Sequence, residues 1–437
     1  MSQRQSAFIL NKMKASRLKT ERQIDTTNHR QYRIQTYGAE NDYPQRVMEI
    51  VEGSVTGNGC VKTYGKFIAG RGFAVRSFYN LRVNGQGKNA DELLQQIADD
   101  YAMFAGFAIH VNYNANYDIV EATHVPFEWL RFDEMNDDYD FMRVAVHPDW
   151  GKRYTSLRRF KSDDIERFPL FDPTPEAIDK EVEEAGGWEY YKGQILYYSN
   201  RGDKTYPRPI YVAALTDMSN EEGLSNITQR NVRHNFLPAG MLVDFDNEAE
   251  SNGQLEETKR ELVEFQGDME AGQLMYVNVR NGESAPEFRS FQTNNYDKAF
   301  TNAEEKTPDI IGRAFSQPPI LRGEDIGAGF GADLMENAYE FYNTITAPER
   351  QKVEQVFKAI FSRWYERGAN PNDDYTILPL AYRVNKSLAE KLGDNTDKVI
   401  ELLYDASKSA ASKRMVLAKI YGLDSEDIDE LINGMGV

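Results

Sequence analysis

The spacing of apolar residues along the chain changes from a helical to a strand-like period near Gly106. Over 91–105 apolar side chains recur every three or four positions, which predicts a helix with one apolar stripe. Beyond Gly106 apolar and polar residues alternate over 107–113 and 119–125, with the turn-like sequence Asn-Ala-Asn-Tyr-Asp between the two runs. This alternation predicts a β-hairpin over 107–125.

The strongest helical pattern lies in the last third of the chain. Its apolar residues stand at helical spacing: Val353, Val356, Phe357, Ile360, Phe361 and Trp364. They form one broad stripe, and Gly368 is predicted to end the helix. A similar apolar face precedes it from Leu334 to Ile345, and Pro348 between the two predicts a kink.

The remaining pattern mixes helices with strands. Further helices are predicted over 41–69, 207–236, 254–267 and 291–315, and in short segments after residue 387. Further strands are predicted over 141–147, 193–199, 241–245 and 273–280. The acidic stretch 176–190 is predicted to be a surface insertion. For 437 residues we expect an α+β protein of two to four domains.

The charge balance restricts the kind of nucleic-acid contact that this protein makes. The chain has 51 Lys and Arg against 69 Asp and Glu, a net charge of −18. Tight DNA binding relies on cations that replace counterions, so a DNA clamp is disfavoured, whereas a wall that surrounds DNA without holding it is not. The basic segment 1–23 is predicted to be a solvated tail, with a contact to a partner subunit or nucleic acid as the alternative.

The cysteine content and the hydropathy pattern favour a cytoplasmic site of folding. Cys60 is the single cysteine, so an internal disulfide and a structural zinc site are both disfavoured. Apolar runs are shorter than the roughly 18 residues that a membrane helix needs. The N-terminal segment turns basic after four apolar residues and does not resemble a signal peptide.

Motifs that carry chemistry are few, and we predict no catalytic residue, no cofactor site and no metal site. Gly-Ala-Gly-Phe-Gly-Ala at 327–332 fits a dinucleotide-binding pattern, but two prolines and two acidic residues precede it where a buried strand is needed. The five histidines are scattered; His110 and His124 can meet across the hairpin, although structural roles are favoured. Arg-Gly-Asp at 201–203 is predicted to be a turn.

Two alternatives to an assembly protein remain open from the residues alone. The first is an enzyme that uses 327–332 as a cofactor loop. The second is an interaction protein that binds DNA through its C-terminal helices, with Lys408, Lys413 and Arg414 as a small basic cluster. Large helices without a catalytic constellation favour the assembly protein instead.

One pair of blocks resembles the portal proteins of tailed bacteriophages. The first block, IIGRAFSQPPILRG, is similar to a family phrase of the form Phe-x-x-Pro-Pro-x-Leu-x-Gly, and the second, ENAYEFYNTITAPERQKVEQVFKAI, to a helix with Phe-x-x-x-Thr-x-x-Pro. The first phrase is matched by Phe315, Pro318, Pro319, Leu321 and Gly323. The second is matched by Phe341 and Pro348, with Ile345 in the place of the threonine. Gly-Arg-Gly-Phe at 70–73 and the stretch 233–243 are also similar to family passages; the resemblance spans 40–365 in separate pieces.

This resemblance implies a ring, usually a dodecamer, at one vertex of a capsid. Double-stranded DNA is packaged and later ejected through such a ring, which docks a terminase large subunit and a head–tail adaptor and contacts the major capsid protein. The implied location is the virion, after synthesis in the cytoplasm of a bacterial host, and ATP hydrolysis belongs to the terminase. The implied layout is an N-terminal arm (1–40), an α/β wing (41–207), a first stem helix (208–237), a small α/β clip (238–290), a second stem helix (291–315), a tunnel loop (316–331), a long helix with a wing return (332–385) and a helical crown (386–437).

The tunnel loop is the functional segment that the resemblance implies. Its candidate residues are Gln317, Pro318, Pro319, Ile320, Leu321, Arg322, Gly323, Ile326, Gly327, Gly329, Phe330 and Gly331. The prolines fix φ and hold the root of the loop, whereas the later glycines permit positive φ and let the far limb shift. Ile326 and Phe330 are predicted to form an apolar collar, and Arg322 a weak phosphate contact. The alternative is an ordinary surface loop whose glycines cap a helix.

Overall fold

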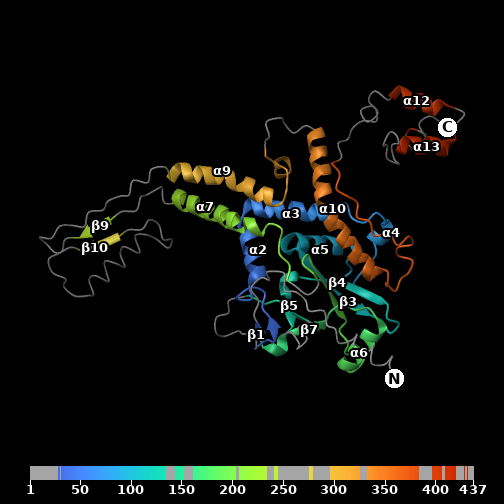
Figure 1. Cartoon of the computed structure of the whole chain (residues 1–437), viewed down its shortest axis with the longest axis horizontal. Helices are drawn as coiled ribbons and strands as arrows, with labels where there is room; N and C mark the ends of the chain where they lie inside the picture. The colour runs from blue at the N-terminus through green and yellow to red at the C-terminus, as the bar shows by residue number, and fades with distance from the viewer. Residues whose placement is uncertain are drawn as a thin grey trace, which may run out of the picture. The chain divides into compact units, whose positions relative to one another are not determined.

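The computed structural model describes 28–29, 31–133, 143–151, 161–202, 206–233, 241–244, 275–278, 296–324, 332–382, 396–405, 409–419, 428 and 431. Contacts divide the chain into two units. Unit 1 comprises Met1–Gly331 and Asn337–Leu380, and unit 2 comprises Ala332–Glu336 and Ala381–Val437. Helices occur together with antiparallel sheets, so the predicted α+β class is confirmed (Figure 1).

Two consecutive helices replace the single helix predicted over 41–69. Helix α2 (Tyr43–Gly53) ends at Ser54, and α3 (Val55–Ala69) begins directly after it. Ser54 has extended backbone angles, and its side chain accepts a hydrogen bond from the backbone N–H of Gly57 at 2.8 Å. This N-cap starts a new helix, which is why the continuous periodicity did not produce one element.

The helix and the hairpin that the change of period predicted are confirmed. Helix α5 (Ala90–Phe104) opens with a capping box between Asn89 and Glu92. Strands β3 (Gly106–Tyr113) and β4 (Ile119–Val125) form the antiparallel hairpin, and β8 (Gln194–Ser199) pairs with the other edge of β3. The sheet order β4-β3-β8 leaves β3 in the centre, where six of its eight residues are buried.

A second antiparallel sheet lies in the same unit. Its strands are, in spatial order, β1 (Asn28–His29), β2 (Ile34–Gln35), β5 (Leu130–Asp133), β6 (Arg143–Val146) and β7 (Glu166–Pro169). The strand predicted over 141–147 is β6, within the described residues. Tyr37, Phe132 and Tyr206 pack together in the core of this region, and Arg131 is fully buried beside them. Arg131 donates to the backbone oxygens of Asn41 (2.9 Å) and Glu128 (3.0 Å), so the buried cation serves the fold.

The acidic stretch 176–190, predicted to be a surface insertion, is mostly exposed but also packs one helix face into the core. It contains α6 (Pro175–Ala185), whose Ile178 and Val182 are buried in the largest apolar cluster of the protein. These two residues are four positions apart and therefore share one helix face. The high density of carboxylates hid a short amphipathic helix with only two buried positions.

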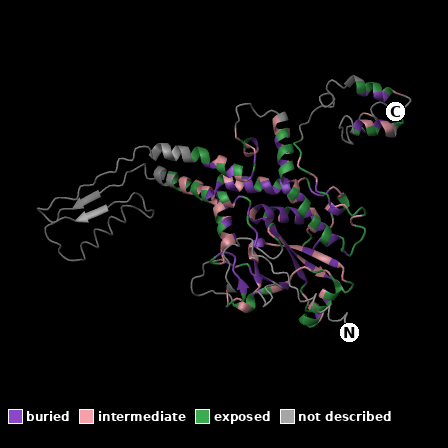
Figure 2. Ribbon diagram, viewed as in Figure 1, coloured by how far each residue is buried: buried purple, intermediate pink, exposed green. Residues whose placement is uncertain are grey.

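The longest helix follows its predicted apolar stripe. Helix α10 (Ala332–Phe361) buries Val353, Phe357, Ile360 and Phe361, while Val356 is half-buried. The helix ends at Phe361, earlier than Gly368. Beyond its end, Trp364 forms an isolated β-bridge with Ile119 of β4. Pro348 lies inside α10, which continues across it. Figure 2 shows buried residues concentrated along α3, α5 and the neighbouring strands.

Two further helices carry the chain outward and back. Helix α7 (Leu215–Arg233) follows a 3-10 turn, and α9 (Tyr296–Ala314) returns beside it (Figure 1). The first helix was expected to run after Pro207 and Pro209, and it begins at Leu215, directly after the 3-10 turn. The predicted strands 241–245 and 273–280 are β9 (Met241–Asp244) and β10 (Met275–Asn278), which pair in parallel. The predicted helix 254–267 lies outside the described residues.

Unit 2 contains α12 (Thr396–Tyr404) and α13 (Ala410–Lys419). Its apolar core consists of Val399, Leu402, Leu403, Leu417 and Ile428. Lys413, one of the three residues considered for DNA binding, is buried, and its ammonium group donates to the backbone oxygen of Leu403 at 2.7 Å. Lys408 lies outside the described residues. Among the described helices, none is long and apolar enough to cross a membrane.

Candidate functional site

The first part of the predicted tunnel loop, residues 316–324, is packed within unit 1 against its helices. We call these residues the loop root. Pro319–Arg322 forms a 3-10 helix that contacts α3 and α9. Gln317 and Ile320 are buried, and Leu321 packs against the main apolar cluster. Gly323 ends the turn with a φ of 80°, a left-handed conformation that favours glycine. Ile326, Gly327, Gly329, Phe330 and Gly331 lie outside the described residues, so their predicted roles stay predictions.

Phe315 joins the loop root to three other segments. Its ring stacks on Tyr211 at a centroid distance of 4.8 Å and meets Tyr64 of α3 edge-on at 6.2 Å. The Tyr342 hydroxyl of α10 donates to the backbone oxygen of Phe315 at 3.2 Å. Phe315 and Tyr342 come from the two sequence blocks that resemble portal proteins. These blocks therefore meet at one junction, directly beside the start of α7.

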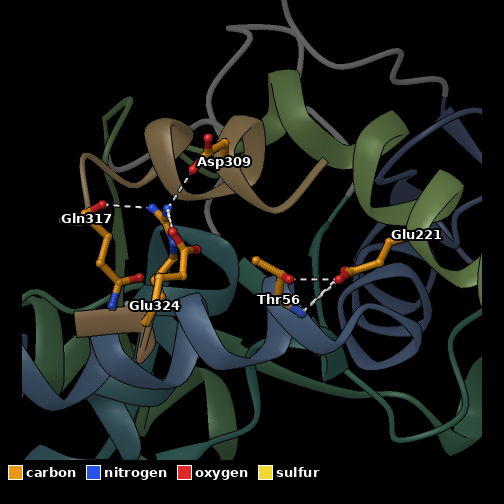
Figure 3. Close-up of polar contacts among 6 residues, drawn as sticks. Thr56, Glu221, Asp309, Gln317 and Glu324 are labelled. Carbon is orange, nitrogen blue, oxygen red and sulfur yellow. Dashed lines mark hydrogen bonds and ion pairs between the residues drawn. The ribbon is translucent and has the colours of Figure 1, made fainter. Parts of the chain in front are cut away.

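Arg322 holds the loop root together through its guanidinium group. The group donates to Asp309 Oδ1 of α9 at 3.0 Å, to Glu324 Oε1 at 2.6 Å and to the backbone oxygen of Gln317 at 2.9 Å (Figure 3). Its side chain is only 7% exposed. Burial acts to lower the pKa of Arg322, but the hydrogen bond and charge of Glu324 outweigh burial and leave that pKa raised.

This arrangement does not support the predicted phosphate contact of Arg322. A guanidinium has five N–H donors, and Arg322 directs its donors to two carboxylates and one carbonyl of its own chain. A DNA phosphate has to displace those carboxylates before it can bind there. Arg322 therefore fixes the local structure, a role that its position in the sequence did not reveal.

Glu221 of α7 makes a second polar contact with α3, at the N-terminus of that helix. Its carboxylate accepts hydrogen bonds from the Thr56 hydroxyl at 2.7 Å and from the Thr56 backbone N–H at 3.2 Å (Figure 3). It also accepts a hydrogen bond from the Ser54 hydroxyl. The first N–H groups of a helix have no partner within it, and the helix dipole favours a negative charge there. The contact thus anchors α7 while completing the cap of α3.

Arg350, two residues after Pro348 in α10, makes hydrogen bonds to two backbone oxygens. Arg350 is buried, and its guanidinium donates to the backbone oxygen of Asn343 at 2.7 Å, one turn before the proline. The same group donates to the Phe67 backbone oxygen at 2.8 Å, near the C-terminus of α3. Arg350 therefore supports the helix around Pro348 and ties α10 to α3. Pro348 lies inside α10, and the kink predicted there stays a prediction.

The described residues around the dinucleotide-like pattern do not provide its structural context. The last described residues before 327–332 form a 3-10 turn followed by Gly323 and Glu324, where the motif requires a buried strand. Cys60, the single thiol, is buried, and burial raises its pKa to about 12, so it is not an activated nucleophile. No cluster of metal-ligating residues occurs in the part of the chain that the structure describes.

The two histidines of the hairpin have separate structural partners. Ile109 is the residue opposite His124, so His110 lies one position away and points to the other face of the sheet. The ring of His110 contacts the backbone oxygen of Lys192 at 2.6 Å, and burial lowers the pKa of His110. The ring of His124 contacts Asp100 at 2.7 Å. Both contacts agree with structural roles.

Comparison with known proteins gives distant structural likenesses. No protein-family model matches the chain, and no curated protein matches it. A chain from the neck of an empty GTA particle, computed with C6 symmetry, is similar over 87% of this chain and 94% of its own length, at 14% identity and a TM-score of 0.45. A chain from the virion of a native gene transfer agent (GTA) particle is similar over 87% and 93%, at 15% identity and a TM-score of 0.43. Likenesses at this distance do not assign a function.

Proposed function

We propose that this protein is a portal protein that forms a ring at one vertex of a phage-like capsid. Double-stranded DNA passes through the ring when it is packaged and again when it is ejected. The observation that carries the proposal is the junction at Phe315. There the two sequence blocks that resemble portal proteins pack against each other and hold the outgoing and returning helices on α3.

The exposure of α7 supports a role in which neighbouring copies cover this helix. Met218 is its one buried residue among those whose side chains the structure describes, whereas Thr216, Ser219, Asn220 and Ser225 are exposed. A polar helix with an internal glycine, Gly223, is marginal on its own in water. Packing between identical helices around an axis supplies the burial that one copy lacks, through a heterologous interface that closes into a ring.

The charge of the chain suits passage of DNA. Many phosphate contacts bind strongly and depend steeply on salt, whereas a net charge of −18 keeps contacts with DNA brief. Arg322 agrees with this proposal because its charge is already paired with Asp309 and Glu324. The force for packaging then comes from a separate terminase, and this chain acts as a conduit and docking platform with no cofactor.

The layout follows from the proposal. Residues 41–207 form the wing, α7 and α9 the stem, and 238–290 the clip that docks the terminase large subunit and later the head–tail adaptor. Residues 316–331 form the tunnel loop, and 386–437 form the crown. The wing contacts the major capsid protein, so the assembled protein resides in the virion. A dodecamer is the expected ring.

A mass measurement tests this proposal. Size-exclusion chromatography with light scattering on the purified full chain should give a mass about twelve times the 50.1 kDa of one copy. Negative-stain images should show rings with a central hole. A monomer or dimer over the whole accessible concentration range contradicts the proposal.

The tunnel-loop assignment has its own experiment. Replacing Gly327, Gly329 and Gly331 with alanine restricts the backbone of the loop, because alanine disfavours positive φ. We expect intact rings of unchanged mass that package less DNA than wild type. Normal packaging by the triple variant argues against a moving loop, even if the ring itself is present.

A further inference from the structure

The guanidinium group of Arg322 lies directly on the backbone of α9 at Gly312. A Cβ placed on Gly312 stands 1.7 Å from Nη1 of Arg322 and 2.4 Å from its Cζ, so alanine cannot coexist with Arg322 in this position. Gly312 is not among the glycines with positive φ. Close approach of a side chain, and not the backbone conformation, is therefore what favours glycine here. We call this contact the Gly312 notch.

The notch lies where α9 ends. The backbone oxygen of Gly312 accepts from the N–H groups of Phe315 at 3.2 Å and Gln317 at 3.0 Å, which turns the chain out of the helix. Arg322 then bridges back from the loop root to Asp309, one turn before the notch. A cation at this end of α9 also interacts favourably with the helix dipole. The two backbone hydrogen bonds to Gly312 and the Arg322–Asp309 contact together fix residues 312–322.

We propose that Arg322, seated in the Gly312 notch, is the positioning residue that sets the direction in which the chain leaves α9. It couples the second stem helix to the loop root, so that a movement of α9 moves residues 316–324 with it. This inference rests on the proposed function for its role in a ring, but the coupling itself is a property of one copy. Lysine does not replace Arg322, because an ammonium group lacks the planar fork that reaches Asp309 and Glu324 together.

A double-mutant cycle tests the coupling in the purified full chain. Gly312→Ala should lower the melting temperature by roughly 2–4 °C, because the new methyl group expels the guanidinium from its three partners. In the Arg322→Ala background the notch is empty, and Gly312→Ala should then raise the melting temperature, because alanine favours a helix interior. The sign of the effect reverses between the two backgrounds. An equal effect in both backgrounds overturns the proposal.

Gly59 provides a matched control. It lies inside α3, is exposed, and a Cβ placed there has no atom within 4 Å. Gly59→Ala should raise the melting temperature equally with and without Arg322. A control that also reverses sign would show that Arg322 acts on the whole fold and not at the notch.

Hydrogen–deuterium exchange separates positioning from general stability. Gly312→Ala, Arg322→Ala and Arg322→Lys should each increase exchange several-fold in peptides that cover 313–324, while peptides of α5 stay unchanged. A positioning role is contradicted if exchange increases equally in 313–324 and in α5. It is also contradicted if the Arg322→Lys variant exchanges in 313–324 as slowly as wild type. A wild-type chain that forms no ring refutes the proposed function, whereas a ring without these exchange changes refutes only this inference.

Discussion

From Asn337 onward α10 belongs to unit 1, as do α7 and α9, but these long helices are held in different ways. From Val353 onward α10 buries an apolar stripe in the main core, where Phe357 lies 4.8 Å from the ring of Phe73. Helices α7 and α9 bury fewer apolar side chains there, Met218 and Ile311, and are also held by the Glu221 contact with α3 and the Arg322 contact with Asp309. The difference teaches that α10 is anchored within one copy by its apolar stripe, whereas in the proposed ring the pair α7–α9 gains further packing from neighbouring copies.

The two modes of attachment differ in strength. Full burial of an aromatic or aliphatic side chain contributes roughly 1.5–3 kcal/mol, and α10 buries several such residues. A partly exposed polar contact contributes on the order of 0.5–1.5 kcal/mol. With fewer buried apolar residues, the pair α7–α9 therefore has the weaker attachment within one copy.

The largest expected effect comes from the core of α10. Phe357→Ala removes a buried ring and should lower the free energy of unfolding by about 3–5 kcal/mol. Chemical denaturation of the purified chain measures this change. Gln355→Ala, on the exposed side of the same helix, is the matched control and should change stability by less than about 0.5 kcal/mol. Similar losses for both variants would mean that α10 is not anchored by its apolar stripe.

A smaller effect is expected at the root of the stem. Glu221→Ala leaves the Thr56 N–H and two hydroxyl groups without their acceptor, and should cost roughly 1–2 kcal/mol. Glu221→Gln keeps an acceptor oxygen and should lose less, and the difference between the two variants measures the contribution of the charge at the helix N-terminus. Asn220→Ala, one position away and exposed, should be neutral. If Asn220→Ala lowers the free energy of unfolding as much as Glu221→Ala, the contact of Glu221 with the N-terminus of α3 is not what stabilises this region.

The smallest effect is a pH-dependent gain within α10. Burial raises the pKa of Glu354, although its carboxylate accepts the backbone N–H of Ile377 at 2.8 Å. A carboxyl group with a raised pKa in the folded state favours folding at low pH and loses that contribution as the pH rises. Glu354→Gln should therefore raise the melting temperature slightly at pH 7, and the gain should vanish below the ordinary pKa of a glutamate. Melting curves between pH 7 and pH 4 check the sign, and a gain that grows towards acid contradicts it.

The sequence predicted the parts of the molecule that local patterns determine. The stripe from Val353 to Trp364, the helix before Gly106 and the hairpin after it follow from periodicity alone. The break at Ser54 follows from a capping residue in a continuous pattern, so a stricter reading of Ser-Val-Thr as a helix start would have found it.

The contacts of the candidate site were less predictable because they join distant residues. Thr56 and Glu221 lie 165 positions apart, and no local pattern pairs them. Arg322 was predicted to make a weak phosphate contact within the tunnel loop, but its charge is paired with Asp309 and Glu324. Gly312 inside a predicted helix was the available signal, since glycine there indicates a close approach of another group.

The most direct test of the account is a single-particle cryo-EM structure of the purified assembly. It should show a closed ring in which residues 316–331 of every copy surround a central hole, with α7 and α9 packed against neighbouring copies. A compact monomer or dimer contradicts the account. So does a ring in which 316–331 lies on the outer rim, away from the symmetry axis.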